Sequence, residues 1–220
     1  METLSQRLQT IYKMVPKGIA ADIGADHGKL IIALFEGGII SHGYAVENKK
    51  GPYNTLVKAL KEKDLLDDIV PLFSDGIKDL PKAVHTVIIA GMGGNLIIDI
   101  LKKYPEKTQQ ISTLIIDAHT CIPKVREEVS KMGFVIADEK MVREDGVFYE
   151  IIKFVRADIA FYGENDLEFG PILRSEKSAT FKEKYQNRIL EIDRLLKNKD
   201  LPLGRVDELS KEKKRIQSIL

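Results

Sequence analysis

The chain has 220 residues, of which 44% are hydrophobic and 30% charged, with a net charge of +1 and one cysteine. This indicates a globular protein with one domain and an appendage, or two small domains. The single cysteine excludes an intramolecular disulfide framework and a Cys-based zinc site. No apolar run of about 18 residues occurs and the N-terminus lacks a signal-peptide pattern, so we expect a cytoplasmic protein that does not enter a membrane.

The predicted elements alternate between helices and strands over most of the chain. A helix is expected from Leu4 to Val15, capped by Ser5 or Thr3. Two late strands are joined through Asp145-Gly146, which is typical of a β-hairpin. The other strands alternate with helices, which predicts parallel pairing and an α/β, Rossmann-like sheet of the class I methyltransferase type. The strands are predicted at residues 19–23, 43–46, 69–73, 86–90, 114–117, 134–142 and 147–155, and the intervening helices at 29–36, 53–63, 94–104 and from 123.

The pattern changes after residue 156. Residues 158–171 look like a connector, and from residue 177 apolar side chains recur at helical spacing until Pro202 and Gly204 interrupt them. This predicts two antiparallel helices that form a C-terminal α-helical, coiled-coil hairpin. The expected domains are therefore residues 1–157 and residues 158–220.

Charge is distributed unevenly between these parts. Residues 172–220 contain 13 basic and 8 acidic side chains, whereas the rest of the chain has a balance of −4. A solvated helical face explains this pattern, since Lys and Glu both favour helix surfaces. A basic surface that holds a polyanion is the alternative.

The most informative stretch runs from Ala20 to Gly28. It reads as a strand, a glycine turn and the start of a helix, and the first such turn in an α/β protein usually binds a nucleotide. Asp26 stands where a pyrophosphate would approach the backbone, and its carboxylate would repel that group. The loop therefore suits a ligand with hydroxyls and positive charge, such as S-adenosylmethionine (SAM), and a purely structural turn is the alternative.

Other strand ends should line the same crevice. Glu47 follows Gly24 by 23 residues, where a carboxylate can accept both ribose hydroxyls. Asp75 can accept from an adenine amino group or form an Asx turn. Three glycines within residues 91–94 indicate a close approach of the backbone to a ligand. The predicted cofactor-binding residues are Asp22, Gly24, Asp26, His27, Glu47, Asn48, Asp75, Gly76, Ala90, Gly91 and Met92.

The same motifs exclude other classes of site. Asn95 and Leu96 follow Gly94 where a phosphate-binding loop needs Lys and Ser or Thr. Met92 stands where a nucleophile elbow would carry serine. The four histidines lack the spacing of metal ligands, so no metal is expected.

Several motifs together resemble the bacterial tRNA (adenine-22-N1)-methyltransferases, over essentially the whole chain. The matching segments are residues 4–8, 22–27, 89–94, 148–152 and 169–171, and Glu47 at four residues before Gly51-Pro52-Tyr53. The resemblance implies a Rossmann-like domain with a helical coiled-coil domain, SAM as cofactor and tRNA as partner. This chain departs from the family in having Ile116-Asp117-Ala118-His119 instead of Leu-Gln-Pro-Asn, and Lys29 and Ile31 instead of Tyr and Pro.

The resemblance implies methyl transfer from SAM to N1 of adenine 22 in tRNA, and we expect the enzyme to be a monomer. The alternatives are a SAM-dependent methyltransferase acting on a small molecule or another RNA, and a non-enzymatic module that binds RNA or protein. Asp26 and Asp117 are the expected catalytic residues, as acceptors for the adenine amino group, with the carbonyls around Gly91 as a further candidate. The expected RNA-binding residues are Arg7, Arg188, Arg194, Lys197 and Lys199.

Overall fold

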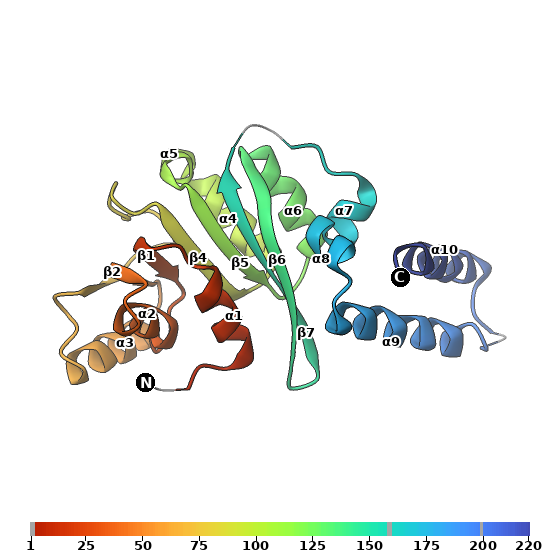
Figure 1. Ribbon diagram of the computed structural model, residues 1–220, viewed down its shortest axis with the longest axis horizontal. Helices are drawn as coiled ribbons and strands as arrows, with labels where there is room; N and C mark the ends of the chain where they lie inside the picture. The colour runs from red at the N-terminus through yellow and green to blue at the C-terminus, as the bar shows by residue number, and fades with distance from the viewer. Residues whose placement is uncertain (1–2, 158–159, 199) are drawn as a thin grey trace.

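A mixed seven-stranded sheet forms the centre of the protein. The computed structural model describes residues 3–157, 160–198 and 200–220. The strand order is β3-β2-β1-β4-β5-β7-β6, with β1 to β5 parallel to one another and β7 antiparallel to β5 and β6 (Figure 1). The predicted α/β fold is therefore confirmed. The strands are β1 Gly18–Ile23, β2 Ile40–Glu47, β3 Ile69–Phe73, β4 Thr86–Met92, β5 Thr113–Ala118, β6 Phe134–Glu144 and β7 Val147–Arg156.

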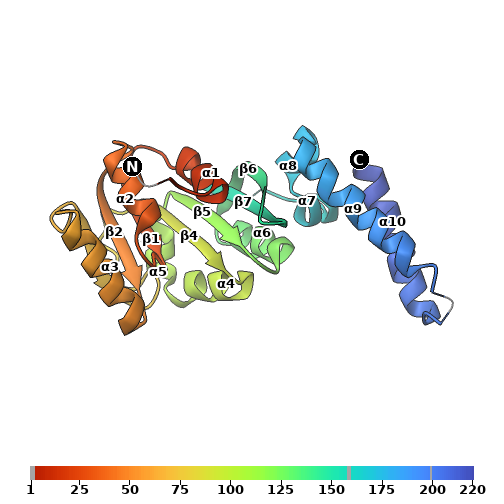
Figure 2. The same cartoon turned by 90° about the horizontal axis from the view of Figure 1, so that it is seen from below.

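Helices cover both faces of this sheet (Figure 2). Side chains alternate along each strand, so Ile88 packs with the helices α1, α2 and α3, whereas Val87 and Ile89 pack with α4 and α6. The crevice at the carboxyl ends of the strands is thus built on two apolar cores. The helices are α1 Gln6–Met14, α2 Lys29–Glu36, α3 Lys50–Glu62, α4 Gly94–Lys103, α5 Pro105–Gln110, α6 Ile122–Lys131, α7 Glu164–Phe169, α8 Pro171–Glu176, α9 Ala179–Leu195 and α10 Leu203–Ile219.

The hairpin between β6 and β7 turns where the sequence predicts it. Asp145 and Gly146 have φ angles of +50° and +80°. Two successive residues with positive φ match the twist of antiparallel strands, and Asp-Gly adopts them at low cost. The strands extend to Glu144 and Arg156, one or two residues beyond their predicted ends.

Three short helices, α5, α7 and α8, were not predicted. The expected connector at residues 158–171 contains α7, whose first turn is stabilised by Asp166 contacting the Gly163 amide at 3.3 Å. The segment is also fixed to the sheet, since the Tyr162 hydroxyl accepts a hydrogen bond from the Ile136 amide at 2.8 Å. Six residues are too few to show a helical period, and the same is true of α5 and α8, which have the same length. Residues 158–159 of this expected connector lie outside the described residues.

The last two helices run antiparallel and project from the sheet domain (Figures 1 and 2). Phe181, Tyr185 and Ile192 on α9 share a buried cluster with Leu209 and Ile216 on α10, which confirms the predicted helical hairpin. The predicted division into residues 1–157 and 158–220 stays a prediction, because the boundary falls at undescribed residues and α7 and α8 pack on α6 and β6. Regular coiled-coil packing also stays a prediction.

A group of four buried or half-buried charges connects the sheet domain to the C-terminal helices. Arg126 is fully buried; its Nε donates to Glu139 at 2.8 Å, and its Nη2 donates to Glu150. Lys184 on α9 donates to the other oxygen of Glu150. Glu139 in turn accepts from the amide of Ile172, in the first turn of α8, at 2.9 Å. We call Arg126, Glu139, Glu150 and Lys184 the joint cluster.

Candidate active site

The loop between β1 and α2 has a backbone that few residue types adopt. Gly24, Asp26 and Gly28 have φ angles of +76°, +50° and +70°, in the left-handed region that favours glycine and tolerates aspartate. A side chain on Gly24 would collide with the Met92 methyl group, and one on Gly28 would lie 2.8 Å from Leu56. Both ends of the loop therefore require glycine, as the sequence predicts for a tight turn.

Glu47, at the end of β2, fixes this loop from the neighbouring strand. Its Oε1 accepts a hydrogen bond from the Asp26 amide at 2.6 Å, and the residue is buried. A carboxylate has about four acceptor positions, so Glu47 can hold the loop and still accept a ligand hydroxyl. The loop and the predicted ribose acceptor are thus part of one structure.

Asp22, next to the end of β1, is a buried carboxyl in the same region. Burial, with a smaller effect from the negative charge of Glu47, raises the pKa of Asp22 to about 7. At neutral pH this carboxyl is therefore close to its titration midpoint. A cation bound beside it would stabilise the ionised form.

Two cavities meet at the glycine loop. One has a volume of about 350 Å³ and lies along Asp22, Asp26, His27 and Ala90. The other has about 320 Å³ and is lined by residues that include Glu47, Asn48, Asp75, Gly76 and Met92. Gly24 lines both. The predicted cofactor-binding residues therefore gather at two adjoining cavities, with Gly91 between Ala90 and Met92 on the same strand.

Asp75 lies at the edge of the second cavity. Its Oδ2 accepts from Lys103 Nζ at 2.6 Å and from the Tyr104 hydroxyl at 2.7 Å, and these hydrogen bonds lower the pKa of Asp75. The carboxylate is therefore held in place by two side chains at the C-terminal end of α4. Its role towards an adenine amino group stays a prediction.

Arg7 and Asp117 meet beside the first cavity. Arg7, on α1, lines that cavity and donates through Nη1 to Asp117 Oδ2 at 2.6 Å. Asp117, on β5, is fully buried, and burial raises its pKa although Arg7 opposes the shift. The adjacent end of β4 is irregular, since Gly91 has a φ of +77° and the pairing with β5 shifts there. A helix 110 residues away in sequence thus contributes to the crevice.

Comparison with known proteins agrees with this geometry. Residues 4–152 match the family described as a methyltransferase domain. The tRNA (adenine(22)-N(1))-methyltransferase of Bacillus subtilis (strain 168) is 30% identical over 199 residues, which span 84% of this chain and 81% of that protein. The chain belongs to this methyltransferase family. The family predicted from the sequence is therefore confirmed.

Solved structures of related methyltransferases share the whole architecture. Sp1610 of Streptococcus pneumoniae, in complex with S-adenosyl-L-methionine, has a TM-score of 0.90 and 29% identity, with 99% of this chain and 100% of that chain covered. The m1A22 tRNA methyltransferase TrmK of B. subtilis has a TM-score of 0.86 and 26% identity, covering 100% and 99%. The likeness therefore includes the C-terminal helices as well as the sheet domain.

The altered strand-five segment of this methyltransferase places its two unusual side chains differently. Asp117 is buried against Arg7, whereas the exposed His119 packs its ring edge-to-face on Tyr149 at 5.6 Å. Tyr149 also lies 5.1 Å from the Arg7 guanidinium, and the Arg7 amide donates to Glu144 at 2.8 Å. Sequence reasoning did not identify Tyr149 or Glu144 as site residues, because their partners are far away in the chain.

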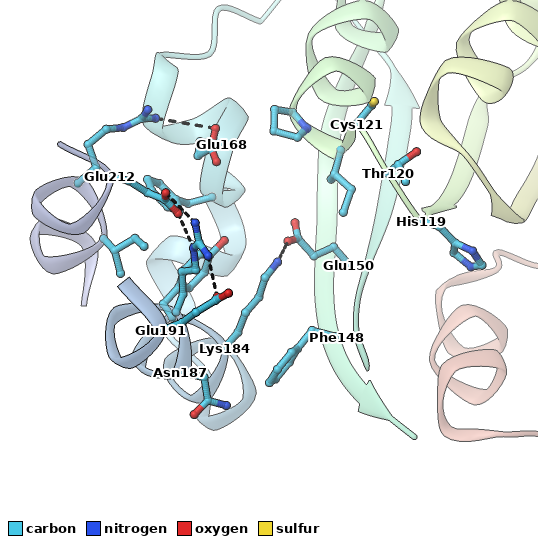
Figure 3. A pocket seen from close by; sticks show the side chains of 17 residues that line it. His119, Thr120, Cys121, Phe148, Glu150, Glu168, Lys184, Asn187, Glu191 and Glu212 are labelled. Atoms are coloured by element: carbon cyan, nitrogen blue, oxygen red, sulfur yellow. Dashed lines mark hydrogen bonds and ion pairs between the residues drawn. The ribbon is translucent and has the colours of Figure 1, made fainter. Parts of the chain in front are cut away.

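The predicted RNA-binding residues of the methyltransferase fall into different surroundings. Arg7 lies in the crevice, and Arg194 and Lys197 are exposed at the end of α9. Arg188 donates to Glu212 at 2.6 and 2.9 Å and to Glu191 at 2.6 Å. It lines a cavity of about 570 Å³ between β7 and the C-terminal helices (Figure 3). Lys199 lies outside the described residues.

Two searches of the described residues are negative. No group of three or more His, Cys, Asp or Glu side chains in this part of the chain could hold a metal ion. None of the described helices is both long and apolar enough to span a bilayer. The expectations about metal and membrane stay predictions.

Proposed function

We propose that this protein transfers a methyl group from SAM to N1 of adenine 22 in tRNA. The observation that carries the proposal is the junction of two carboxylate-lined cavities at Gly24, in a chain of the tRNA (adenine-22-N1)-methyltransferase family. Asp22, Asp26 and Glu47 give this junction the charge that suits a cationic ligand with hydroxyls.

In this proposal, each cavity holds a different part of the cofactor. Glu47 and Asp75 offer oxygens to ribose hydroxyls and to an adenine amino group, and Asn48 and Gly76 line the same cavity. Asp22 and Asp26 offer negative charge in the other cavity, where His27 and Ala90 complete the wall. When bound, SAM supplies a methyl group attached to a positively charged sulfur.

The chemistry of the acceptor sets what the protein must do. Adenine N1 reacts through a lone pair and carries no proton, so a strong general base is not required. Rate then depends on holding N1 in line with the methyl group and on keeping water away. Asp26, which lines the first cavity, and the backbone carbonyls around Gly91 are the proposed acceptors for the adenine amino group. The N1 edge is hidden in a base pair, so the target nucleotide must be unpaired or flipped out.

The helical hairpin of α9 and α10 is the proposed tRNA-binding part. Its exposed cations Arg194 and Lys197 can contact phosphates, and Lys199 belongs to the same proposal from the sequence alone. A monomeric state and a cytoplasmic location are also proposals that rest on the sequence.

The test is methyl transfer from tritiated SAM to unmodified tRNA transcripts, followed by nucleoside analysis. We expect N1-methyladenosine in a transcript with adenine 22, and no product when guanosine replaces that adenine. Saturable SAM binding without transfer to tRNA would contradict the proposed substrate and favour a small-molecule acceptor.

A further inference from the structure

Asp117 stands at the end of β5, where the crevice opens, but its carboxylate does not reach the crevice. The residue has no exposed surface, and Oδ2 is occupied by Arg7 Nη1 at 2.6 Å. Oδ1 has no hydrogen bond from the described residues, although the Gly91 backbone amide and His119 lie near enough to the carboxyl to lower its pKa against the larger effect of burial. A ligand in the crevice would therefore meet Arg7 before it met Asp117.

Arg7 is fixed in the crevice by contacts with three other elements. Asp117 on β5 holds the guanidinium, and the Tyr149 ring on β7 lies 5.1 Å from it. Glu144, at the end of β6, accepts from the Arg7 backbone amide at 2.8 Å. The Arg7 side chain is still 21% exposed and lines the cavity that contains Asp22. Its position is thus fixed while part of its surface faces the cavity.

The guanidinium has donors to spare. It carries five N–H groups, and the contact with Asp117 uses one of them. These donors suit a ring nitrogen such as adenine N7, or a phosphate oxygen. The N1 lone pair must stay free for attack, so a donor at N7 or at phosphate can orient the nucleotide without blocking the reaction.

The buried carboxylate also balances the charge of Arg7. Methyl transfer moves a positive charge from the sulfonium to the adenine, so an uncompensated guanidinium beside the reaction would oppose both species. The Asp117 carboxylate at 2.6 Å makes the pair close to neutral. Asp117 thus fixes the position of the Arg7 guanidinium and balances its charge, and both effects act through Arg7.

We propose that Arg7 contacts the acceptor nucleotide through its free N–H groups, and that Asp117 is a positioning residue that acts only through Arg7. This inference rests on the proposed tRNA methyltransferase function. It replaces the direct contact between Asp117 and adenine that the sequence suggests with an indirect one.

A double-mutant cycle tests whether Asp117 acts through Arg7. The variants are Arg7→Met, Asp117→Asn and the combination, assayed for kcat and KM with a tRNA transcript, with SAM affinity measured by calorimetry. We expect each single variant to lower kcat/KM for tRNA by about tenfold to a hundredfold, as misplacement of a positioning group does. The double variant should be no worse than Arg7→Met alone, because the pair works as a unit.

The matched control is Lys13→Met, which removes an exposed cation from the same helix and should leave kcat/KM unchanged. A transcript with 7-deazaadenosine at position 22 lacks the N7 acceptor and so distinguishes a contact with N7 from a contact with phosphate. If Arg7 binds N7, Arg7→Met should lower kcat/KM less with this transcript than with the unmodified one. Thermal unfolding identifies a variant that fails to fold, and Arg7→Lys then repeats the test with the charge kept and the planar fork lost.

The outcomes separate this inference from the proposed function. If the wild type methylates adenine 22 and the double variant loses the product of the two single effects, Asp117 acts independently and the inference is wrong. If Arg7→Met and Arg7→Lys both retain wild-type kcat/KM, Arg7 does not contact the nucleotide and the inference is also wrong. If the wild type transfers no methyl group to tRNA, the proposed function fails and this inference fails with it.

Discussion

Asp117 beside the crevice and Glu150 in the joint cluster are both buried carboxylates on neighbouring strands, and each contacts an arginine. Their pKa shifts are nevertheless opposite. Burial raises the pKa of Asp117, and the partly exposed Arg7 does not offset it. Burial acts in the same direction on Glu150, but Arg126 and Lys184 together hold its pKa below the usual range.

The difference lies in how completely each carboxylate is paired. Both oxygens of Glu150 accept from a cation, and Glu139 beside it contacts Arg126 and the first turn of α8. Beside the crevice, Asp117 Oδ1 lacks a hydrogen bond from the described residues, and in the crevice burial raises the pKa of Asp22 to about 7. Complete pairing indicates a structural role, whereas incomplete pairing is typical of a ligand site.

The largest expected effect is in the joint cluster. Arg126→Met removes the cation between two buried carboxylates, Glu139 and Glu150, and leaves them without their shared partner. We expect the free energy of unfolding to fall by about 3–5 kcal/mol, the usual cost of breaking a buried ion pair. Urea denaturation at neutral pH measures it.

The matched control for this prediction is Lys124→Met, on the exposed side of the same helix, where the lysine contacts Asn95 at 2.9 Å. That variant should change the free energy of unfolding by less than about 0.5 kcal/mol. Equal effects of the two substitutions would show that the joint cluster is no more important to stability than a surface contact.

In the crevice, removal of a buried charge should stabilise the protein. The pKa of Asp22 rises from 3.8 to about 7 on folding, so the folded state binds the proton more tightly than the unfolded chain. The free energy of unfolding of the wild type should therefore fall as the pH rises from about 4 to about 7. Asp22→Asn abolishes this titration, and at pH 8 it should be more stable than the wild type by up to about 4 kcal/mol.

Urea denaturation at pH 5 and pH 8, with and without SAM, measures this. The same substitution should weaken SAM binding, because the carboxylate that a cation would stabilise is gone. Asp26→Asn, on the exposed side of the loop, is the control and should show no gain in stability at pH 8. If Asp22→Asn differs from the wild type equally at both pH values, the stability change does not come from the charge.

The contrast also explains what could be predicted from the sequence. The glycine loop, Glu47 at the end of β2 and the Asp145-Gly146 turn follow from local spacing, and the structure places them as expected. The pairs Arg7–Asp117 and Arg126–Glu150 join residues 110 and 24 positions apart, and no local pattern encodes them.

Gly170 is an example of a motif residue whose reason lies in the joint cluster. It has a φ of +79°, and a side chain there would lie 2.7 Å from Arg126 and Glu139. The sequence identifies the Phe169-Gly170-Pro171 motif only through the resemblance to a family. Its physical cause is a close approach that exists only in the folded protein.

The smallest expected effect concerns two arginines of the α9–α10 hairpin. As with the two carboxylates, one of them is fully paired within the described residues and the other is not. Arg188 is held by Glu212 and Glu191, whereas Arg194 is exposed about 1.7 turns further along α9. A phosphate must compete with two carboxylates for Arg188. Arg194→Met should therefore weaken tRNA binding a few-fold and reduce the slope of log Kd against log salt concentration by somewhat less than about 1. Arg188→Met should change that slope by less than half as much.

Filter binding at salt concentrations between about 50 and 300 mM gives this slope for both variants. A larger slope change for Arg188→Met would mean that tRNA displaces the two carboxylates, and that pairing within the hairpin does not decide which cations bind RNA.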